Sequence, residues 1–310
     1  MKKVELHLHL DGSLDINYAS KLAGRDITSE MVSRNDTSLT DYLKKFDLPA
    51  ELFQDYDDIV NFSYLLAKSL EDEEVIYAEV RFCPFFHDKK ISVDRVITGI
   101  KEGFSKVLSV KINLIFCMMR HFSFEENMKI VRLAQKYYGN GCCALDLAGD
   151  EFNFKTYTFK ELFEEVKKTG IPFTIHAGEA DGYQSVLDAI SLGAKRIGHG
   201  IRCIEDLETI KKLKDKNIIL EICPDSNLDT FSVNSIEEHP VKQLDDLGIL
   251  ITISTDNRTV SETSLANEYT SLKKAFGFTD DDFIRFNLNA IEGAFISENE
   301  KRELKRQLLN

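Results

Sequence analysis

The 310-residue sequence predicts an α/β fold, namely a (β/α)8 TIM barrel with additional helices. Strand and helix patterns alternate eight times along the chain. Most predicted strands are short, continuous apolar runs, as expected for parallel strands covered by helices. An open doubly wound sheet is the alternative fold, but it usually has a glycine-rich phosphate loop after its first strand. Here the first strand ends in His-Leu-Asp-Gly.

The first predicted strand, residues 4–10, alternates apolar and polar side chains. Because alternate side chains of a strand share a face, His7 and His9 point the same way, and Asp11 follows just before a glycine turn. Two neighbouring imidazoles are a common pair of metal ligands. The alternative is a pair of polar residues on the solvated face of an edge strand.

The other elements follow from apolar runs, which indicate strands, and from apolar residues spaced three or four apart, which indicate helices. Ser38 or Thr40 is expected to cap a short helix that Pro49 follows, and Gly170 and Gly193 end two later helices. The further predicted strands are residues 75–82, 111–118, 142–147, 172–175, 196–198, 218–222 and 250–254. The predicted helices are residues 14–24, 39–46, 55–73, 93–107, 125–138, 159–168, 184–192, 204–215, 240–247, 262–276, 280–292 and 297–308.

The net charge of −13 and the pI near 5.1 argue against nucleic acid or an anionic membrane surface as a partner. The basic N-terminus is not followed by an apolar signal region, and no apolar run approaches the ~18 residues of a membrane span. The six cysteines form no CxxC pair, which indicates free thiols in a reducing compartment. We therefore expect a cytoplasmic protein with one domain over residues 1–310 and no obligate protein partner.

In a TIM barrel the active site lies at the carboxyl ends of the strands. His7 and His9 end the first predicted strand, His176 and His199 follow the fifth and sixth, and Asp256 follows the eighth. A single histidine at a strand end is often only a hydrogen-bonded structural residue, but this coincidence at one rim favours a metal site. The imidazoles of His7, His9 and His176 and the carboxylate of Asp256 form a ligand set that suits zinc, with iron, cobalt or manganese possible, and His199 is left over.

Two further side chains at this rim could act on a substrate. A water coordinated to such a metal would have a pKa near ~7, and His199 could orient or deprotonate it. Glu179, three residues beyond His176, could donate a proton to the substrate. A metal site with a spare acid and a spare base indicates hydrolytic attack on an electrophilic carbon. Asp150 and Glu151, by contrast, could simply cap the next helix.

Seven stretches of the chain, in the same order, resemble the adenosine deaminase family of metal-dependent barrel hydrolases. Each stretch is a weak signal alone, but the seven are distributed along residues 5–256 in one order, and together they are very specific. They are residues 5–13 (ELHLHLDGS), 117–121 (CMMRH), 145–151 (LDLAGDE), 175–179 (IHAGE), 198–200 (GHG), 221–224 (EICP) and 254–256 (STD).

This resemblance implies hydrolytic deamination of adenosine and 2′-deoxyadenosine to inosine and 2′-deoxyinosine plus ammonia, in purine salvage. One Zn²⁺ per chain would be held by the three imidazoles of His7, His9 and His176 together with Asp256. Glu179 would protonate N1 of the purine as C6 is attacked. His199 would activate the water, and Asp256 would also hydrogen-bond it.

The resemblance also implies a set of contacts to a small purine nucleoside. Asp11 would accept a hydrogen bond from a ribose hydroxyl, and the N–H of Gly149 would approach purine N3 closely. Asn257 stands where animal relatives carry a second aspartate facing N7; its amide can donate without first binding a proton. The implied substrate-binding residues are His9, Asp11, Tyr42, Leu43, Phe46, Gly149 and Asn257.

Two other functions remain open from the sequence. The first is deamination of adenine or of another 6-aminopurine nucleoside or nucleotide, although a phosphate would need clustered Lys or Arg and Asp11 would repel it. The second is a non-catalytic nucleoside-binding barrel, which the filled catalytic positions disfavour. A zinc site of the cytidine deaminase type requires H-x-E and P-C-x-x-C, and the chain has neither.

Overall fold

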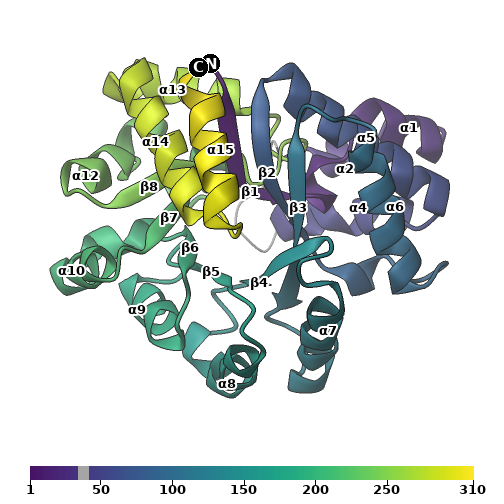
Figure 1. Ribbon diagram of the computed structural model, residues 1–310, viewed down its shortest axis with the longest axis horizontal. Coiled ribbons are helices and arrows are strands. Elements are labelled where there is room, and N and C mark those ends of the chain that lie inside the picture. The colour runs from purple at the N-terminus through teal and green to yellow at the C-terminus, as the bar shows by residue number, and fades with distance from the viewer. Residues whose placement is uncertain (34–41) are drawn as a thin grey trace.

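The computed structural model describes residues 1–33 and 42–310, and it confirms the predicted (β/α)8 barrel. Parallel strands form the centre of the molecule, and helices surround them (Figure 1). The strands are β1 (Lys3–His9), β2 (Val75–Phe82), β3 (Lys111–Met119), β4 (Cys142–Ala148), β5 (Thr174–Ala177), β6 (Arg196–His199), β7 (Ile219–Ile222) and β8 (Leu250–Ile253).

The strands pair in sequence order, β1 to β4 and β5 to β8, and two narrow seams join these halves. At the seam between β4 and β5, the N–H of Leu145 donates to the carbonyl of Pro172 at 3.0 Å. At the seam between β8 and β1, His9 N–H donates to the carbonyl of Asp256 at 2.7 Å, and Asp256 N–H donates to that of His7 at 2.9 Å. The barrel therefore closes through the backbone of three predicted metal ligands.

Most predicted helices lie within three residues of their observed positions. Strand β5 begins two residues later than predicted, after Pro172, which has no N–H to give to a ladder. Helix α10 begins at Leu207 because the side chain of Asp206 caps it. The described helices are α1 (Ile16–Ala23), α2 (Thr28–Met31), α4 (Asp47–Leu52), α5 (Tyr56–Asp72), α6 (Val93–Ser105), α7 (Phe124–Tyr137), α8 (Lys160–Thr169), α9 (Tyr183–Leu192), α10 (Leu207–Asp215), α11 (Pro224–Asp229), α12 (Val241–Asp246), α13 (Leu265–Phe276), α14 (Asp280–Gly293) and α15 (Glu298–Leu309).

The short helices α2, α4 and α11 were not predicted. The start of the helix predicted at 39–46, with its proposed caps Ser38 and Thr40, lies outside the described residues. Within the described residues, the predicted helix end at residue 46 agrees with a 3-10 turn over Lys44–Phe46, and a separate helix, α4, then begins at Asp47 and includes Pro49. Pro49 lies in the first turn of α4, where a backbone N–H would have no acceptor within the helix.

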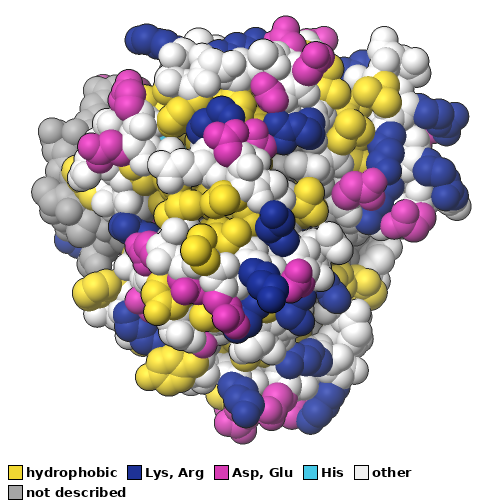
Figure 2. Space-filling model, turned by 90° about the vertical axis from the view of Figure 1, so that its left-hand side faces the viewer, with side chains coloured by type: hydrophobic (Ala, Val, Ile, Leu, Met, Phe, Trp, Pro, Cys, Tyr) yellow, Lys and Arg dark blue, Asp and Glu magenta, His cyan; other side chains and the backbone are white. Residues whose placement is uncertain are grey.

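The alternation in β1 places its apolar and polar side chains on opposite faces. Val4 and Leu6 pack outward in a cluster with Ile291 of α14 and Leu304 of α15. Both chain ends lie beside these helices (Figure 1). Within the described ranges, no helix combines the length and apolar character needed to cross a bilayer. On the face drawn in Figure 2, Lys and Arg side chains lie among Asp and Glu rather than forming one basic surface.

Candidate active site and metal centre

A cavity of about 400 Å³ opens at the carboxyl ends of the strands. It contains every site residue predicted from the sequence except His7, which lies fully buried beneath it. Apart from histidines, the charged side chains along its described lining are all carboxylates. The lining includes His9, Asp11, Tyr42, Leu43, Phe46, Asp47, Phe86, Met119, His121, Gly149, Asp150, His176, Glu179, His199, Thr230, Asp256 and Asn257.

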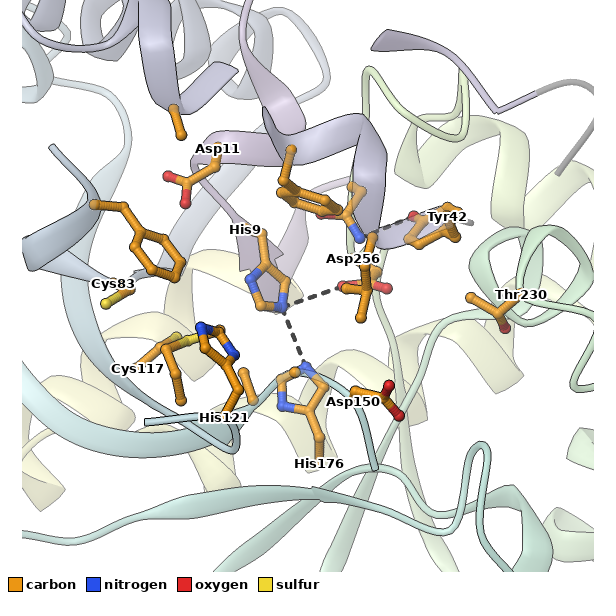
Figure 3. A pocket seen from close by; sticks show the side chains of 18 of the residues that line it. His9, Asp11, Tyr42, Cys83, Cys117, His121, Asp150, His176, Thr230 and Asp256 are labelled. Carbon is orange, nitrogen blue, oxygen red and sulfur yellow. Dashed lines mark hydrogen bonds and ion pairs between the residues drawn. The ribbon is translucent and has the colours of Figure 1, made fainter. Parts of the chain in front are cut away.

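The four predicted metal ligands converge at the base of this cavity. His9 Nε2 lies 3.1 Å from His176 Nε2 and 3.3 Å from Asp256 Oδ1. Figure 3 shows His9 pointing at both partners. His7 Nε2 also lies 3.3 Å from Asp256 Oδ1. One ligand atom each from His7, His176, His199 and Asp256 lies within 4.8 Å of the others, so His199 belongs to the same cluster.

The hydrogen bonds around this cluster fit a cation. Nδ1 of His7 donates to Glu221 Oε2 at 2.6 Å, and Nδ1 of His176 lies 3.0 Å from Asp146 Oδ2. These contacts put the ring protons on Nδ1 and aim the Nε2 lone pairs at one point. His7 Nε2 and Asp256 Oδ1 are buried there without a hydrogen-bond partner. Burial of such polar atoms is unfavourable unless another group binds them, and a metal ion satisfies both.

The two carboxylate oxygens of Asp256 face different histidines. Oδ1 faces Nε2 of His7 and of His9, whereas Oδ2 accepts from Ser226 Oγ at 2.6 Å and lies 4.0 Å from His199 Nε2. Asp256 and His199 have φ angles of 58° and 60°, in the left-handed region that is unfavourable for residues other than glycine. Such strain persists where the surrounding structure holds it, commonly at functional sites.

Glu179 and His199 lie side by side with shifted pKa values. Burial, reinforced by the charge of Asp256, raises the pKa of Glu179 to about 8. Burial also lowers the pKa of His199 well below its usual range. His199 Nε2 lies 3.5 Å from Glu179 Oε2. At neutral pH the pair therefore consists of a protonated acid and an uncharged imidazole.

The loop that carries Glu179 is held by Glu151. Its carboxylate accepts from the backbone N–H groups of Gly178, Glu179 and two following residues, and from Ser185 Oγ. The alternative in which Asp150 and Glu151 cap the next helix was therefore wrong, because neither side chain caps α8. Glu151 instead fixes the backbone beside the candidate acid.

On the substrate side, Gly149 has a φ of 100°, which favours glycine. The side-chain amide of Asn257 donates one N–H to Tyr42 Oη at 2.9 Å, and this contact leaves its second N–H to donate elsewhere. The Oδ1 of Asn257 is buried against Gly12. A Cβ at residue 12 would lie only 1.9 Å from this oxygen, so a residue with a side chain does not fit there. Asp11 Oδ1 lies 3.0 Å from Nε2 of His87.

Sequence reasoning missed the charged residues beneath the histidines. Arg81 Nη1 donates to Asp146 at 2.9 Å and its Nη2 donates to Glu221 at 2.8 Å, so it joins the two carboxylates that orient His7 and His176. All three charged side chains are fully buried. A charged residue inside an otherwise apolar strand was the available signal, because such a residue needs a buried partner.

Comparison with known proteins agrees with the resemblance read from the sequence. A family model described as adenosine deaminase matches residues 2–310. The adenosine deaminase of Clostridium perfringens is 36% identical over 327 aligned positions, covering 100% of this chain and 98% of the relative. That of Enterococcus faecalis is 36% identical, with 99% of this chain and 96% of the relative covered.

Solved structures share the architecture. The Arabidopsis N6-mAMP deaminase is 26% identical with a TM-score of 0.90, and the alignment covers 99% of this chain and 97% of that one. An amidohydrolase solved with bound Zn is 20% identical with a TM-score of 0.89 over 100% of this chain and 90% of that one, which shows the fold alone. On its fold and on the match along residues 2–310, the chain belongs to the adenosine deaminase family.

Proposed function

We propose that this chain is a zinc-dependent adenosine deaminase, which hydrolyses adenosine and 2′-deoxyadenosine to inosine and 2′-deoxyinosine and releases ammonia. The observation that carries the proposal is the convergence of His7, His9, His176 and Asp256 below a nucleoside-sized cavity that also contains Glu179. In this proposal the whole chain, residues 1–310, is one catalytic domain that serves purine salvage. Because its six cysteines are free and buried thiols, we place it in the cytoplasm.

His7, His9, His176 and Asp256 would hold one Zn²⁺. Three imidazoles and a carboxylate are ordinary zinc ligands, and the carboxylate partners of His7 and His176 orient the rings for this role. When bound, the metal supplies a coordinated water with a pKa of about 7, far below that of bulk water.

Glu179 would donate a proton to purine N1. With its pKa raised to about 8, the carboxyl carries a proton at neutral pH. Thr230 Oγ1 donates to Glu179 Oε1 at 2.9 Å, and Asn227 Nδ2 donates to the same oxygen at 3.0 Å. Because Oε1 accepts two hydrogen bonds, the proton belongs on Oε2. A proton delivered to N1 lets the ring accept charge at C6.

His199 and Asp256 would orient the water, since His199 Nε2 and Asp256 Oδ2 lie 4.0 Å apart at the same side of the cluster. Gly149 would bring its N–H to purine N3, and the remaining N–H of Asn257 would donate to N7. Asp11 would accept a hydrogen bond from a ribose hydroxyl, and His9 would also face the substrate. Further hydrophobic surface for the purine would come from Tyr42, Leu43 and Phe46.

Two observations bear on the alternative substrates. The Arabidopsis enzyme named as an N6-mAMP deaminase has the same fold at 26% identity, so an adenine nucleotide is the second candidate. However, the carboxylates of Asp11, Asp47 and Asp150 line the cavity, and these would repel a phosphate. We therefore favour a nucleoside.

The test combines metal analysis with an absorbance assay on adenosine, 2′-deoxyadenosine, adenine and AMP. We expect about one zinc per chain and the highest kcat/KM for the two nucleosides. Glu179→Gln should keep the zinc and lower kcat by about 10²- to 10⁴-fold, the contribution typical of a general acid. A zinc-loaded protein that ignores adenosine, or one that clearly prefers AMP, would overturn the proposal.

A further inference from the structure

His239 lies outside the cavity lining, yet its hydrogen bonds lead directly to Glu179 and His199. It is buried at the start of α12, only 2% exposed. Pro240 follows it and has no N–H, so the first N–H of this helix belongs to Val241 and donates to His239 Nδ1 at 3.1 Å. A backbone N–H can only donate. Nδ1 of His239 is therefore the acceptor, and the ring proton sits on Nε2.

This proton fixes the orientation of a neighbouring amide. His239 Nε2 lies 3.2 Å from Asn227 Oδ1 and donates to it. Burial lowers the pKa of His239 to about 3, so the ring stays neutral and its single proton points at Asn227. With its oxygen assigned in this way, the amide of Asn227 must turn its NH₂ group to the opposite side.

The NH₂ group of Asn227 then divides its two protons between the candidate catalytic residues. One N–H donates to Glu179 Oε1 at 3.0 Å, and the other donates to His199 Nδ1 at 3.1 Å. Because Nδ1 of His199 accepts a hydrogen bond, its proton must lie on Nε2, the atom that faces Asp256 and Glu179. A doubly protonated ring would place an N–H against the N–H of Asn227.

We propose that His239 and Asn227 are positioning residues that hold the ring proton of His199 on Nε2, leave its Nδ1 as an acceptor, and keep Oε1 of Glu179 as an acceptor. His199 is therefore a hydrogen-bond donor toward the reacting water rather than the base that removes its proton. The value of this arrangement for catalysis rests on the proposed function, whereas the proton positions do not depend on it.

The first test is the tautomer of His199 in zinc-loaded protein whose histidines carry ¹⁵N in the ring. Two-bond ¹H–¹⁵N spectra at pH 7 distinguish the tautomers, and His199→Gln and His239→Asn assign the two rings. We expect each ring to carry its proton on Nε2 and none on Nδ1, because Nδ1 accepts a hydrogen bond in both. A proton on Nδ1 of His199, or a doubly protonated ring, would overturn the inference. The spectrum needs no substrate, so it remains decisive even if the protein ignores adenosine.

The second test replaces the donor group of Asn227 that faces His199 with an acceptor. In Asn227→Asp an acceptor faces His199 Nδ1, so the proton of His199 should move from Nε2 to Nδ1, and kcat should fall about 10-fold with little change in KM. His239→Asn keeps an acceptor for Val241 N–H but loses the donor to Asn227, and we expect mixed tautomers at His199. His239→Gln restores a donor and should recover most of the kcat. Unchanged His199 spectra in both Asn227→Asp and His239→Asn would contradict the inference.

Discussion

The interior of the barrel contains two layers of titratable side chains that differ in how charge is balanced within the layer. The lower layer, which we call the floor, consists of Glu79, Arg81, Asp146, Arg196 and Glu221. Every floor carboxylate contacts a guanidinium within 2.9 Å. The upper layer, which we call the mouth, consists of His7, His9, His176, Glu179, His199 and Asp256, a set with two carboxylates and no Lys or Arg.

The pKa values record this difference. In the floor, burial alone would raise the pKa of Glu221, but Arg81 and Arg196 outweigh it and hold this pKa well below its usual range. In the mouth, burial and the charge of Asp256 raise the pKa of Glu179 to about 8. The floor is therefore electrostatically complete within the chain, whereas the mouth suits an added cation. The contacts His7–Glu221 and His176–Asp146 link the two layers.

The largest effect should come from removing a floor cation. Arg81→Met leaves Asp146 and Glu221 buried without this partner and should lower the free energy of unfolding by about 3–5 kcal/mol. The control is Arg306→Met, which breaks an ion pair with Glu303 whose side chains are 72% and 50% exposed and should cost at most about 1 kcal/mol. Urea unfolding measures both. Equal losses would mean that the floor is no more sensitive than the surface.

The link between the layers can be weakened through Glu221. Glu221→Gln keeps the shape but replaces the charged acceptor of His7 Nδ1, so the affinity for zinc should fall about 10- to 100-fold. Glu268→Gln is a control for the change of a buried carboxyl, because Glu268 is as buried as Glu221 but hydrogen-bonds the backbone of Asp225. Competition with a chelator of known affinity gives the ratio. Equal zinc affinities in the two variants would show that the floor does not affect the metal site.

The pH dependence of stability should sharpen the contrast. The pKa of Glu179 rises from 4.5 to about 8 on folding. The contribution of this group to the free energy of unfolding is therefore fully present below pH 4.5 and is lost as the pH rises to about 8. In chelator-treated protein, this one group should lower the free energy of unfolding by up to about 1.4 kcal/mol per pH unit in that window. Glu179→Gln should remove this slope. If the free energies of unfolding of the two proteins, measured with urea, change with pH in the same way, Glu179 is not protonated in the folded protein.

The smallest effect should come from the wall of the mouth. Tyr42→Phe removes the acceptor of Asn257 Nδ2 without changing the charge, so KM for adenosine should rise by no more than about 10-fold at constant kcat. Tyr157→Phe is the control, since Tyr157 is 63% exposed and lies outside the cavity lining. A large loss of kcat in Tyr42→Phe would instead place the hydroxyl near the reacting atoms.

Local patterns in the sequence determined much of this protein. The alternation in β1 located that strand and placed His7 and His9 on the inner face, and apolar runs located most of the other strands. These features could be predicted because side-chain periodicity is a property of a short segment. The short helices α2, α4 and α11 were missed because one or two turns carry too little periodicity to detect.

The tertiary structure alone decided which polar groups pair. His7 and Glu221 are 214 residues apart, and Asn227 meets Glu179 and His199 only because β5, β6 and α11 reach the same end of the barrel. Seen along the chain, Glu221 and Asp146 are single charges in apolar strands, and His239 precedes an ordinary helix start. Their partners depend on barrel closure and on the direction of each hydrogen bond, and neither is encoded in the spacing of nearby residues.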